Sequence, residues 1–379
     1  MNYNATNVVN SDHYMFVDVC KGIAMLMIIV VHCGQSFPKL NKILFYGTIY
    51  GQMGCQLFLL LSSFLLCNTY EKSKLLSLKY YKKKYIKLMC PFLLASFIYL
   101  FAFEIEKAYG SFHCFDPMYS CKNIILDYLL LQQFDINGFN SLVPGGWYMG
   151  ALWLTYLLFP LIIKLYSYIY RKYIKLVNLF PLFFTLIVIV FQSILVNAGY
   201  DKVGNNTFLY FSLLNQIPAI WFGISLYYDF TKSKSASCDY NGRISFEKFI
   251  CFTVLSLALF LINKFFSFPL IVYFASLSFY QLCLLVAHLL QIKRNSKTIG
   301  KLLSSFGKKS LGIYLTHFIF VWFIPQHFFQ TIKFNQTLLF MIYVICSFFI
   351  TYYVGAAFVK INSVVSKPIL SFVDREYKK

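Results

Sequence analysis

Long apolar runs follow one another along nearly the whole chain, and they limit what it can fold into more than any other feature. They lie between residues 14 and 361. Each is close to the roughly 20 residues that a helix needs to cross a bilayer. Lipid offers the backbone no hydrogen bonds, so runs of this length cross as helices. The sequence therefore predicts an all-α polytopic transmembrane helical bundle of about ten spans. The expected spans are 14–37, 43–67, 88–106, 147–168, 176–196, 207–228, 248–263, 268–292, 310–329 and 336–361.

The distribution of basic residues predicts the orientation of these spans. The segments 68–87, 164–175, 229–248, 293–309 and 360–379 contain 26 Lys and Arg, whereas the alternate loops contain seven. Because cytoplasmic loops are enriched in these residues, both termini are expected in the cytoplasm. The net charge of +20 has the same explanation, since it is concentrated in short loops between spans. The lipid bilayer, and not nucleic acid, is the expected partner.

We expect one membrane domain at residues 14–361, a cytoplasmic segment at 1–13 and a basic cytoplasmic tail at 362–379. The outer loop 107–146 contains an apolar stretch, Asn123 to Phe134, that is too short to cross. This stretch predicts an interfacial or a re-entrant helix. Cys114 and Cys121 lie in the same loop, where a disulfide and two free thiols are both compatible with the sequence. The cysteine spacings match no metal site, and no metal is expected.

The first span carries three ionisable residues, Asp18, Lys21 and His32. Such residues are costly inside a membrane and therefore indicate function. Lys21 and His32 are eleven residues apart, about 20° past three full helical turns, so both lie on one face about 16 Å apart. Asp18 precedes Lys21 by three residues and can pair with it. This stripe should face the bundle interior or a water-filled cavity, with a structural polar seam as the alternative.

Charged residues of the third span lie at matching depths. Glu104, near its outer end, is level with His32, where a carboxylate would orient the imidazole and raise its basicity. Lys84 and Lys87 are one turn apart near the level of Lys21. These lysines predict a cationic mouth on the cytoplasmic side, which suits a phosphorylated donor. The alternative is an ordinary basic cytoplasmic loop.

Five short motifs occur in a fixed order along the chain. They are Lys21 with His32 after ten intervening residues, the run Leu57-Phe58 to Ser62-Ser63-Phe64, Lys84 and Lys87 before Pro91, Trp147-Tyr148 opening the fourth span, and Ser310-Leu311-x-Ile313-Tyr314-Leu315-x-His317. Together they resemble the family 3 membrane acyltransferases, which modify bacterial surface polysaccharides and related glycans. The resemblance covers about residues 14 to 360. Ser63 departs from the family's glycine, and Lys84 and Lys87 replace an arginine pair that can hold a phosphate bidentately.

The resemblance implies an acyl-CoA-dependent O-acyltransferase in the bacterial cytoplasmic (inner) membrane. Acetyl-CoA would be the acyl donor, bound at Lys21, Lys84 and Lys87, and no cofactor would be bound permanently. His32 would act as general base on a hydroxyl of a surface polysaccharide or lipid-linked sugar, or would take part in passing the acyl group outward, with Glu104 as its partner. Such an enzyme transfers groups other than amino-acyl groups.

Other polar and aromatic residues have weaker assignments. Trp147 and Tyr148 would line the acceptor side in this resemblance, although aromatic residues at an outer interface are equally compatible with a membrane belt. Asp18 and His317 are expected to be structural polar residues, and His288 matches no motif.

A transporter or flippase for a lipid-linked glycan is the main alternative, because a polar stripe through half of the membrane would serve it too. Transporters often contain internal repeats and helices broken at mid-membrane, and the sequence shows no such repeat. A membrane scaffold without chemistry leaves the stripe of Lys21 and His32 unexplained. The sequence does not identify the acceptor glycan, the length of the acyl group or the oligomeric state. It also does not distinguish direct transfer from transfer through an acyl-enzyme.

Overall fold

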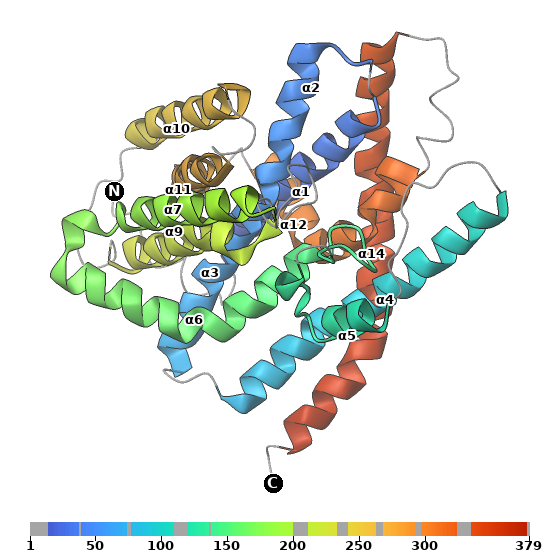
Figure 1. Ribbon diagram of the computed structural model, residues 1–379, viewed down its shortest axis with the longest axis horizontal. Coiled ribbons are helices and arrows are strands. Elements are labelled where there is room, and N and C mark those ends of the chain that lie inside the picture. Colours follow the sequence, from blue (N-terminus) through green and yellow to red (C-terminus); the bar gives the residue numbers. More distant parts are fainter. Residues whose placement is uncertain are drawn as a thin grey trace.

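A computed structural model describes residues 14–37, 39–73, 77–109, 120–135, 138–199, 211–232, 242–262, 268–292, 297–323 and 335–376. Within these ranges the regular structure is helical (Figure 1). The α-helices are α1 (Met15–Gln35), α2 (Lys42–Ile49), α3 (Gly54–Ser73), α4 (Leu78–Tyr109), α5 (Cys121–Tyr128), α6 (Trp147–Lys172), α7 (Phe180–Asn197), α9 (Leu213–Lys232), α10 (Gly242–Ile262), α11 (Phe268–Ile292), α12 (Lys297–Phe318) and α14 (Gln336–Glu376). Short 3₁₀ segments are η2 (Tyr50–Met53), η3 (Gln132–Phe134) and η4 (Ile174–Leu176), and η6 (Ile319–Phe323) is a π-helix.

The predicted fold class, an all-α polytopic helical bundle, is confirmed. Seven helical segments among the described residues are long and apolar enough to cross a membrane: Met15–Gln35, Lys42–Glu71, Leu78–Ala108, Trp147–Lys172, Phe180–Asn197, Phe268–Leu290 and Gln336–Glu376. Helices α9, α10 and α12 overlap the other three expected spans, and their crossing stays a prediction. The basic segment 293–309 was expected as a loop, but α12 already begins at Lys297.

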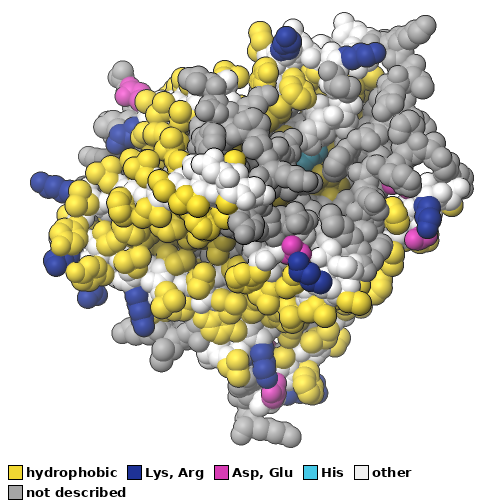
Figure 2. Space-filling view, viewed as in Figure 1, with side chains coloured by type: hydrophobic (Ala, Val, Ile, Leu, Met, Phe, Trp, Pro, Cys, Tyr) yellow, Lys and Arg dark blue, Asp and Glu magenta, His cyan; other side chains and the backbone are white. Residues whose placement is uncertain are grey.

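Hydrophobic side chains cover much of the described surface. Figure 2 shows them spread over the left and lower parts of one face, with lysines and arginines mostly near its edges. Exposed rings and aliphatic chains such as Phe101 of α4, Phe183 of α7 and Phe349 of α14 belong to helices that are long enough to span. An outward-facing apolar surface of this kind suits contact with lipid and not with water.

Helices α1 and α12 form the most extensive helix pair in the described bundle. Two glycines allow this close approach, Gly22 of α1 and Gly307 of α12. A Cβ atom at either position would lie well under 3.0 Å from a backbone oxygen of the other helix, that of Leu303 or of Asp18. The two backbones are therefore in contact in the amino-terminal halves of α1 and α12. This contact fixes how the side chains of the two carboxyl-terminal halves face each other.

The departure at Ser63 is compensated by another helix. Ser63 is fully buried in α3. A Cβ at Gly223 of α9 would lie 2.8 Å from the Cβ of Ser63, and closer still to the backbone oxygen of Leu60. The close approach of α3 to a neighbour is therefore present, with the glycine supplied by α9.

The carboxyl-terminal helix holds the amino-terminal end of α4. Helix α14 has 41 residues, a length of about 62 Å that exceeds the roughly 30 Å hydrocarbon core. Near its end, Asp374 pairs with Lys79 at 3.0 Å and with Lys83 at 2.5 Å, and Glu376 pairs with Lys82 at 2.9 Å. The tail expected at 362–379 thus continues the helix as far as Glu376, and its acidic groups bind lysines of α4.

Candidate active site

His32 lies in the last turn of α1 and is half-buried. Its Nδ1 is 2.8 Å from Oε1 of Gln35, one turn further along. Ser36 follows, and its hydroxyl donates to the backbone oxygen of Val321 in η6 at 2.8 Å. The polar end of α1 is therefore fastened to the π-helix that continues α12.

His317 of α12 lies beside His32. The centres of the two imidazole rings are 5.2 Å apart, and the ring of Phe318 lies 4.2 Å from that of His32. His317 is fully buried, and its Nδ1 is 2.6 Å from the backbone oxygen of Tyr314. The structure thus brings a residue expected to be structural directly against the expected base.

The helix changes from α to π immediately after this pair. A π-helix forms i→i+5 hydrogen bonds and occurs most often as a short bulge at functional sites. Side chains of other helices bond its carbonyl groups: the hydroxyl of Ser36 donates to Val321, and that of Tyr343 in α14 donates to Phe320. Helices α1 and α14 therefore hold the π segment in place beside His317.

The outer loop reaches the same place through Gly145. Tyr314 donates its hydroxyl to the backbone oxygen of Gly145 at 2.8 Å. Gly145 has a φ of +78°, in the left-handed region that favours glycine, and a Cβ there would lie 3.1 Å from the Tyr314 hydroxyl. The loop is thereby fixed against α12 just before α6 begins.

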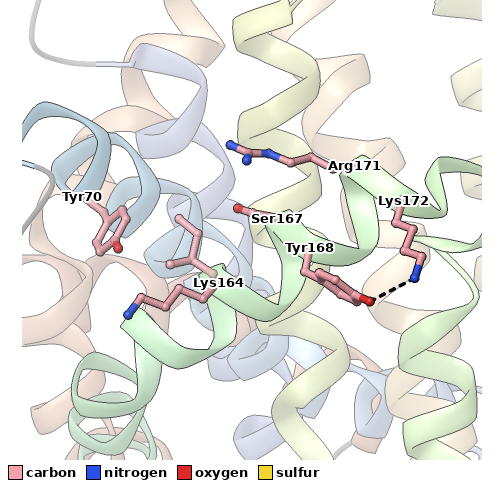
Figure 3. A pocket seen from close by; sticks show the side chains of 7 residues that line it. Tyr70, Lys164, Ser167, Tyr168, Arg171 and Lys172 are labelled. Carbon is pink, nitrogen blue, oxygen red and sulfur yellow. Dashed lines mark hydrogen bonds between the residues drawn. The ribbon is translucent and has the colours of Figure 1, made fainter.

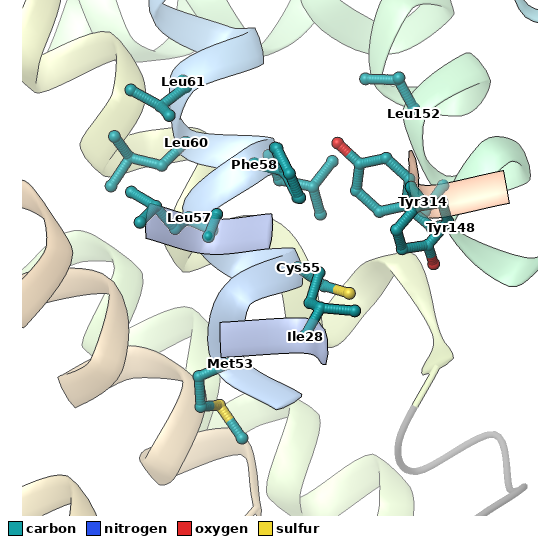
Figure 4. Packing of buried hydrophobic residues seen from close by; sticks show 14 of the residues in the cluster. Ile28, Met53, Cys55, Leu57, Phe58, Leu60, Leu61, Tyr148, Leu152 and Tyr314 are labelled. Atoms are coloured by element: carbon teal, nitrogen blue, oxygen red, sulfur yellow. The ribbon is translucent and has the colours of Figure 1, made fainter. Parts of the chain in front are cut away.

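Trp147 and Tyr148, the first residues of α6, are buried in the core. The ring of Tyr148 lies 5.2 Å from that of Tyr314, and Figure 4 shows both beside Phe58 and Cys55 of α3. Both residues therefore face the interior, and Tyr148 is connected to His317 through the ring of Tyr314. A belt residue at the membrane surface would have an exposed ring.

The stretch expected as an interfacial or re-entrant helix forms α5 and η3. The backbone oxygen of Tyr128 accepts a hydrogen bond of 2.5 Å from Tyr85 of α4. Tyr85 lies 24 residues before Tyr109, about 36 Å from the end of α4 that leads into the outer loop. Side-chain amides of Gln132 and Gln133 donate to the backbone oxygens of residues 146 and 147. These contacts favour the re-entrant form.

One acidic residue of this segment is buried. Asp127 accepts hydrogen bonds at one carboxylate oxygen from the Ser141 hydroxyl at 2.8 Å and the Leu142 amide at 3.1 Å. Burial raises the pKa of Asp127 from 3.8 to about 7; the two hydrogen bonds oppose this shift, and the charge of Asp135 adds to it. Cys121 is an exposed free thiol, and Cys114 lies outside the described residues.

A second set of polar groups lies further along the same face of α1. Lys84 of α4 is half-buried, and its Nζ lies 4.9 Å from the centre of the Tyr156 ring. The charges of Lys87 and Lys21 both act on it, which places the three expected cations in one region. Asp18 acts on Lys21 as an opposite charge. Lys87 itself is exposed, so Lys21 and Lys84 face the interior most directly.

Tyrosines connect the cationic region with the histidine pair. Tyr156, whose ring Lys84 approaches, and Tyr148 are both buried residues of α6. The ring of Tyr314 lies 5.2 Å from that of Tyr148 and 5.7 Å from that of His317. Hydroxyl groups therefore follow one another inside the bundle from the lysines to the imidazoles.

Glu104 does not join this group. It is exposed on α4, and no hydrogen bond or ion pair joins it to His32 within the described residues. Helix α4 packs mainly on α14, α6 and α12, whereas α1 packs mainly on α12 and α3. Gln35, from the same helix as His32, occupies the position beside the imidazole that Glu104 was expected to take.

A cavity of about 550 Å³ lies elsewhere, along the carboxyl-terminal half of α6 (Figure 3). It is lined by Tyr70 of α3 and by Ile163, Lys164, Ser167, Tyr168, Arg171 and Lys172. Its basic side chains are exposed, and the histidine pair does not line it. Among the described residues, no group of three His, Cys, Asp or Glu side chains is placed to hold a metal ion.

Comparison with known protein families matches residues 14–358 to the family described as acyltransferase domain. The match covers the bundle from the first residue of the structure to the middle of α14, including both histidines and the lysine region. No curated protein and no solved structure matches the chain.

Proposed function

The chain belongs to this acyltransferase family, and on that premise we propose that it is an integral membrane O-acyltransferase acting at the bacterial cytoplasmic membrane. It moves an acetyl group from cytoplasmic acetyl-CoA to a hydroxyl of a surface polysaccharide or lipid-linked sugar. The observation that carries this proposal is the half-buried His32, set against His317 at one end of a polar stripe that has Lys21 and Lys84 at its other end.

The lysine end suits the donor. Coenzyme A carries several phosphate groups, and half-buried ammonium groups bind phosphate through charge-assisted hydrogen bonds. Lys21 lies about 16 Å along α1 from His32 and Lys84 lies near Lys21, so phosphates held there leave the acyl thioester to extend toward the imidazole. Lysine has no planar fork for bidentate contact, so these residues act through charge and not through shape.

The imidazole end suits proton transfer. With Nδ1 of His32 directed at Gln35, Nε2 is the nitrogen that accepts the proton of the sugar hydroxyl. The hydroxyl oxygen then bonds the acyl carbon while the carbon–sulfur bond breaks, and the proton finally reaches the thiolate, so the products are an O-acyl sugar and free coenzyme A. Trp147 and Tyr148 would contact the acceptor, since Tyr148 lies against Tyr314, which in turn lies against His317.

Transfer of labelled acetyl groups from acetyl-CoA into glycans of membranes tests this proposal. His32→Ala should abolish transfer at matched expression, since positioned acid–base groups contribute roughly 10²- to 10⁴-fold. His288→Ala is the matched control, because His288 of α11 belongs to no motif of the family. Transfer that survives in His32→Ala would remove this residue from the reaction, and the absence of transfer in the wild type with its host glycans would favour the transporter alternative.

A further inference from the structure

The tautomer of His317 follows from its hydrogen bond to the backbone. Nδ1 faces the backbone oxygen of Tyr314 at 2.6 Å, and a carbonyl oxygen only accepts. Nδ1 of the neutral imidazole must therefore carry the hydrogen, which leaves the lone pair on Nε2. That Nε2 is buried and has no hydrogen-bond partner within the described residues. A buried acceptor without a partner costs about 1–3 kcal/mol, so its retention needs an explanation.

His32 supplies a complementary partner. The centres of the two rings lie 5.2 Å apart. Nδ1 of His32 is also occupied, by Oε1 of Gln35, so the lone pair of each imidazole is on Nε2. Two imidazoles of this kind hold one extra proton better than one of them alone, because the lone pair of the second ring stabilises the positive charge on the first.

Among the described residues around the pair, no charged side chain is placed to stabilise this extra proton. The titratable side chains packed around the pair are thiols and phenols, which are ordinarily uncharged near pH 7. They are Cys33 of α1, Cys55 of α3, Tyr99 of α4, Tyr148 of α6, Tyr314 of α12 and Tyr343 of α14. No described hydrogen bond or ion pair joins either imidazole to a carboxylate or an ammonium group.

We propose that His317 shares the proton that His32 removes from the acceptor hydroxyl, so that the two residues act as one base. The inference rests on the proposed function. The O–H bond of the acceptor breaks and an N–H bond forms at Nε2 of His32, while the lone pair on Nε2 of the neighbouring His317 stabilises the positive charge of the imidazolium. When the carbon–sulfur bond breaks, the proton passes from His32 to the thiolate, and both imidazoles return to their neutral state. His317 never touches the substrate and is a positioning residue.

Two conservative substitutions separate this role from a structural one. In His317→Asn the amide nitrogen replaces Nδ1 and keeps the bond to Tyr314, but nothing replaces Nε2. In His317→Gln the side chain reaches the Nε2 position and offers an oxygen acceptor there, but the bond to Tyr314 is lost. Proton sharing predicts a lower kcat for Asn than for Gln. A purely structural histidine predicts the reverse order.

The assay is acetyl transfer by purified protein in liposomes across pH 5 to 9. We expect His317→Asn to lower kcat about 10- to 100-fold with little change in KM for acetyl-CoA. We also expect the acidic limb of its pH–rate profile to move to lower pH, because a single imidazole holds the proton less well. Wild-type kcat and an unchanged profile in His317→Asn would overturn the proposal.

A second measurement needs no turnover and therefore separates failure of this inference from failure of the proposed function. ¹⁵N-histidine solid-state NMR of the protein in liposomes reads tautomer and protonation directly, with signals assigned by His32→Ala and His317→Ala. We expect the two residues to titrate together in the wild type, and the remaining one to titrate at a different pH in each variant. Independent titration of His317, with or without His32, would overturn the inference even if acetyl transfer is demonstrated.

Discussion

Asp127 should make the re-entrant segment sensitive to pH. Its carboxyl is 1% exposed, with a pKa of about 7 in the folded protein against an ordinary 3.8. A raised pKa means that the folded state binds the proton more tightly than the open state does. The stabilisation is thus fully present below about pH 3.8 and is lost as the pH rises through about 7. The difference of 3.2 pKa units corresponds to about 4 kcal/mol, at about 1.36 kcal/mol per unit.

Replacement of Asp127 by Asn removes this titration. The amide oxygen can still accept from Ser141 and Leu142, but the group does not ionise. For the wild type, the same proton linkage predicts that the free energy of opening falls by about 3 kcal/mol between pH 5 and pH 8. For Asp127→Asn the free energy of opening the segment should be the same at both pH values.

Hydrogen–deuterium exchange of protein in nanodiscs measures this opening, because it reports local unfolding without global denaturation. Peptides within 120–146, corrected for the intrinsic pH dependence of exchange, should lose protection between pH 5 and pH 8 in the wild type and not in Asp127→Asn. Asp135→Asn is the control: Asp127 still ionises in it, so the loss of protection should remain, with its midpoint at lower pH because the charge of Asp135 raises the pKa of Asp127. An equal loss of protection in wild type and Asp127→Asn would refute the reasoning.

Three further outcomes are expected. Lys84→Ala should raise the KM for acetyl-CoA several-fold more than Lys87→Ala does, because Lys84 is half-buried at the site and Lys87 is exposed. Steady-state kinetics of the protein in liposomes measures both values. Gly145→Ala should lower kcat without loss of folded protein, because the left-handed backbone costs an alanine about 1–2 kcal/mol and its Cβ would displace Tyr314. A kcat equal to that of the wild type would contradict this prediction. Asp374→Asn together with Glu376→Gln should change the thermal midpoint little, because water screens these exposed ion pairs. A large fall in the midpoint would contradict this expectation.

The helices were predictable because span length and apolar composition depend on local sequence alone. The start of α12 was not. Lys301, Lys308 and Lys309 made its first half look like a loop, yet Lys309 lies over the ring of Tyr352 at 4.4 Å and bonds the Ser305 hydroxyl. A basic amphipathic helix that packs on α14 has the charge density of a cytoplasmic loop, and composition does not separate the two.

The site was predicted in part for a related reason. Helical periodicity places Lys21 and His32 on one face of α1, because both belong to one helix. The pairing of His32 with Glu104 rested on depth alone, and equal depth does not say which helices are neighbours. The motif containing His317 was visible in the sequence, but its contact with His32 depends on the crossing of α1 and α12, which only packing reveals.

The glycine contact between α1 and α12 has a consequence for how the protein tolerates mutation. At Gly22 and Gly307 main chain meets main chain, so no rotamer can relax to admit a larger residue. The distance between the axes of α1 and α12, and with it the separation of the two imidazoles, is thus set by main-chain contact. A complete substitution scan should therefore find its most intolerant positions at these two glycines, about 15 Å along their helices from the histidines, while many side chains nearer the histidines remain replaceable.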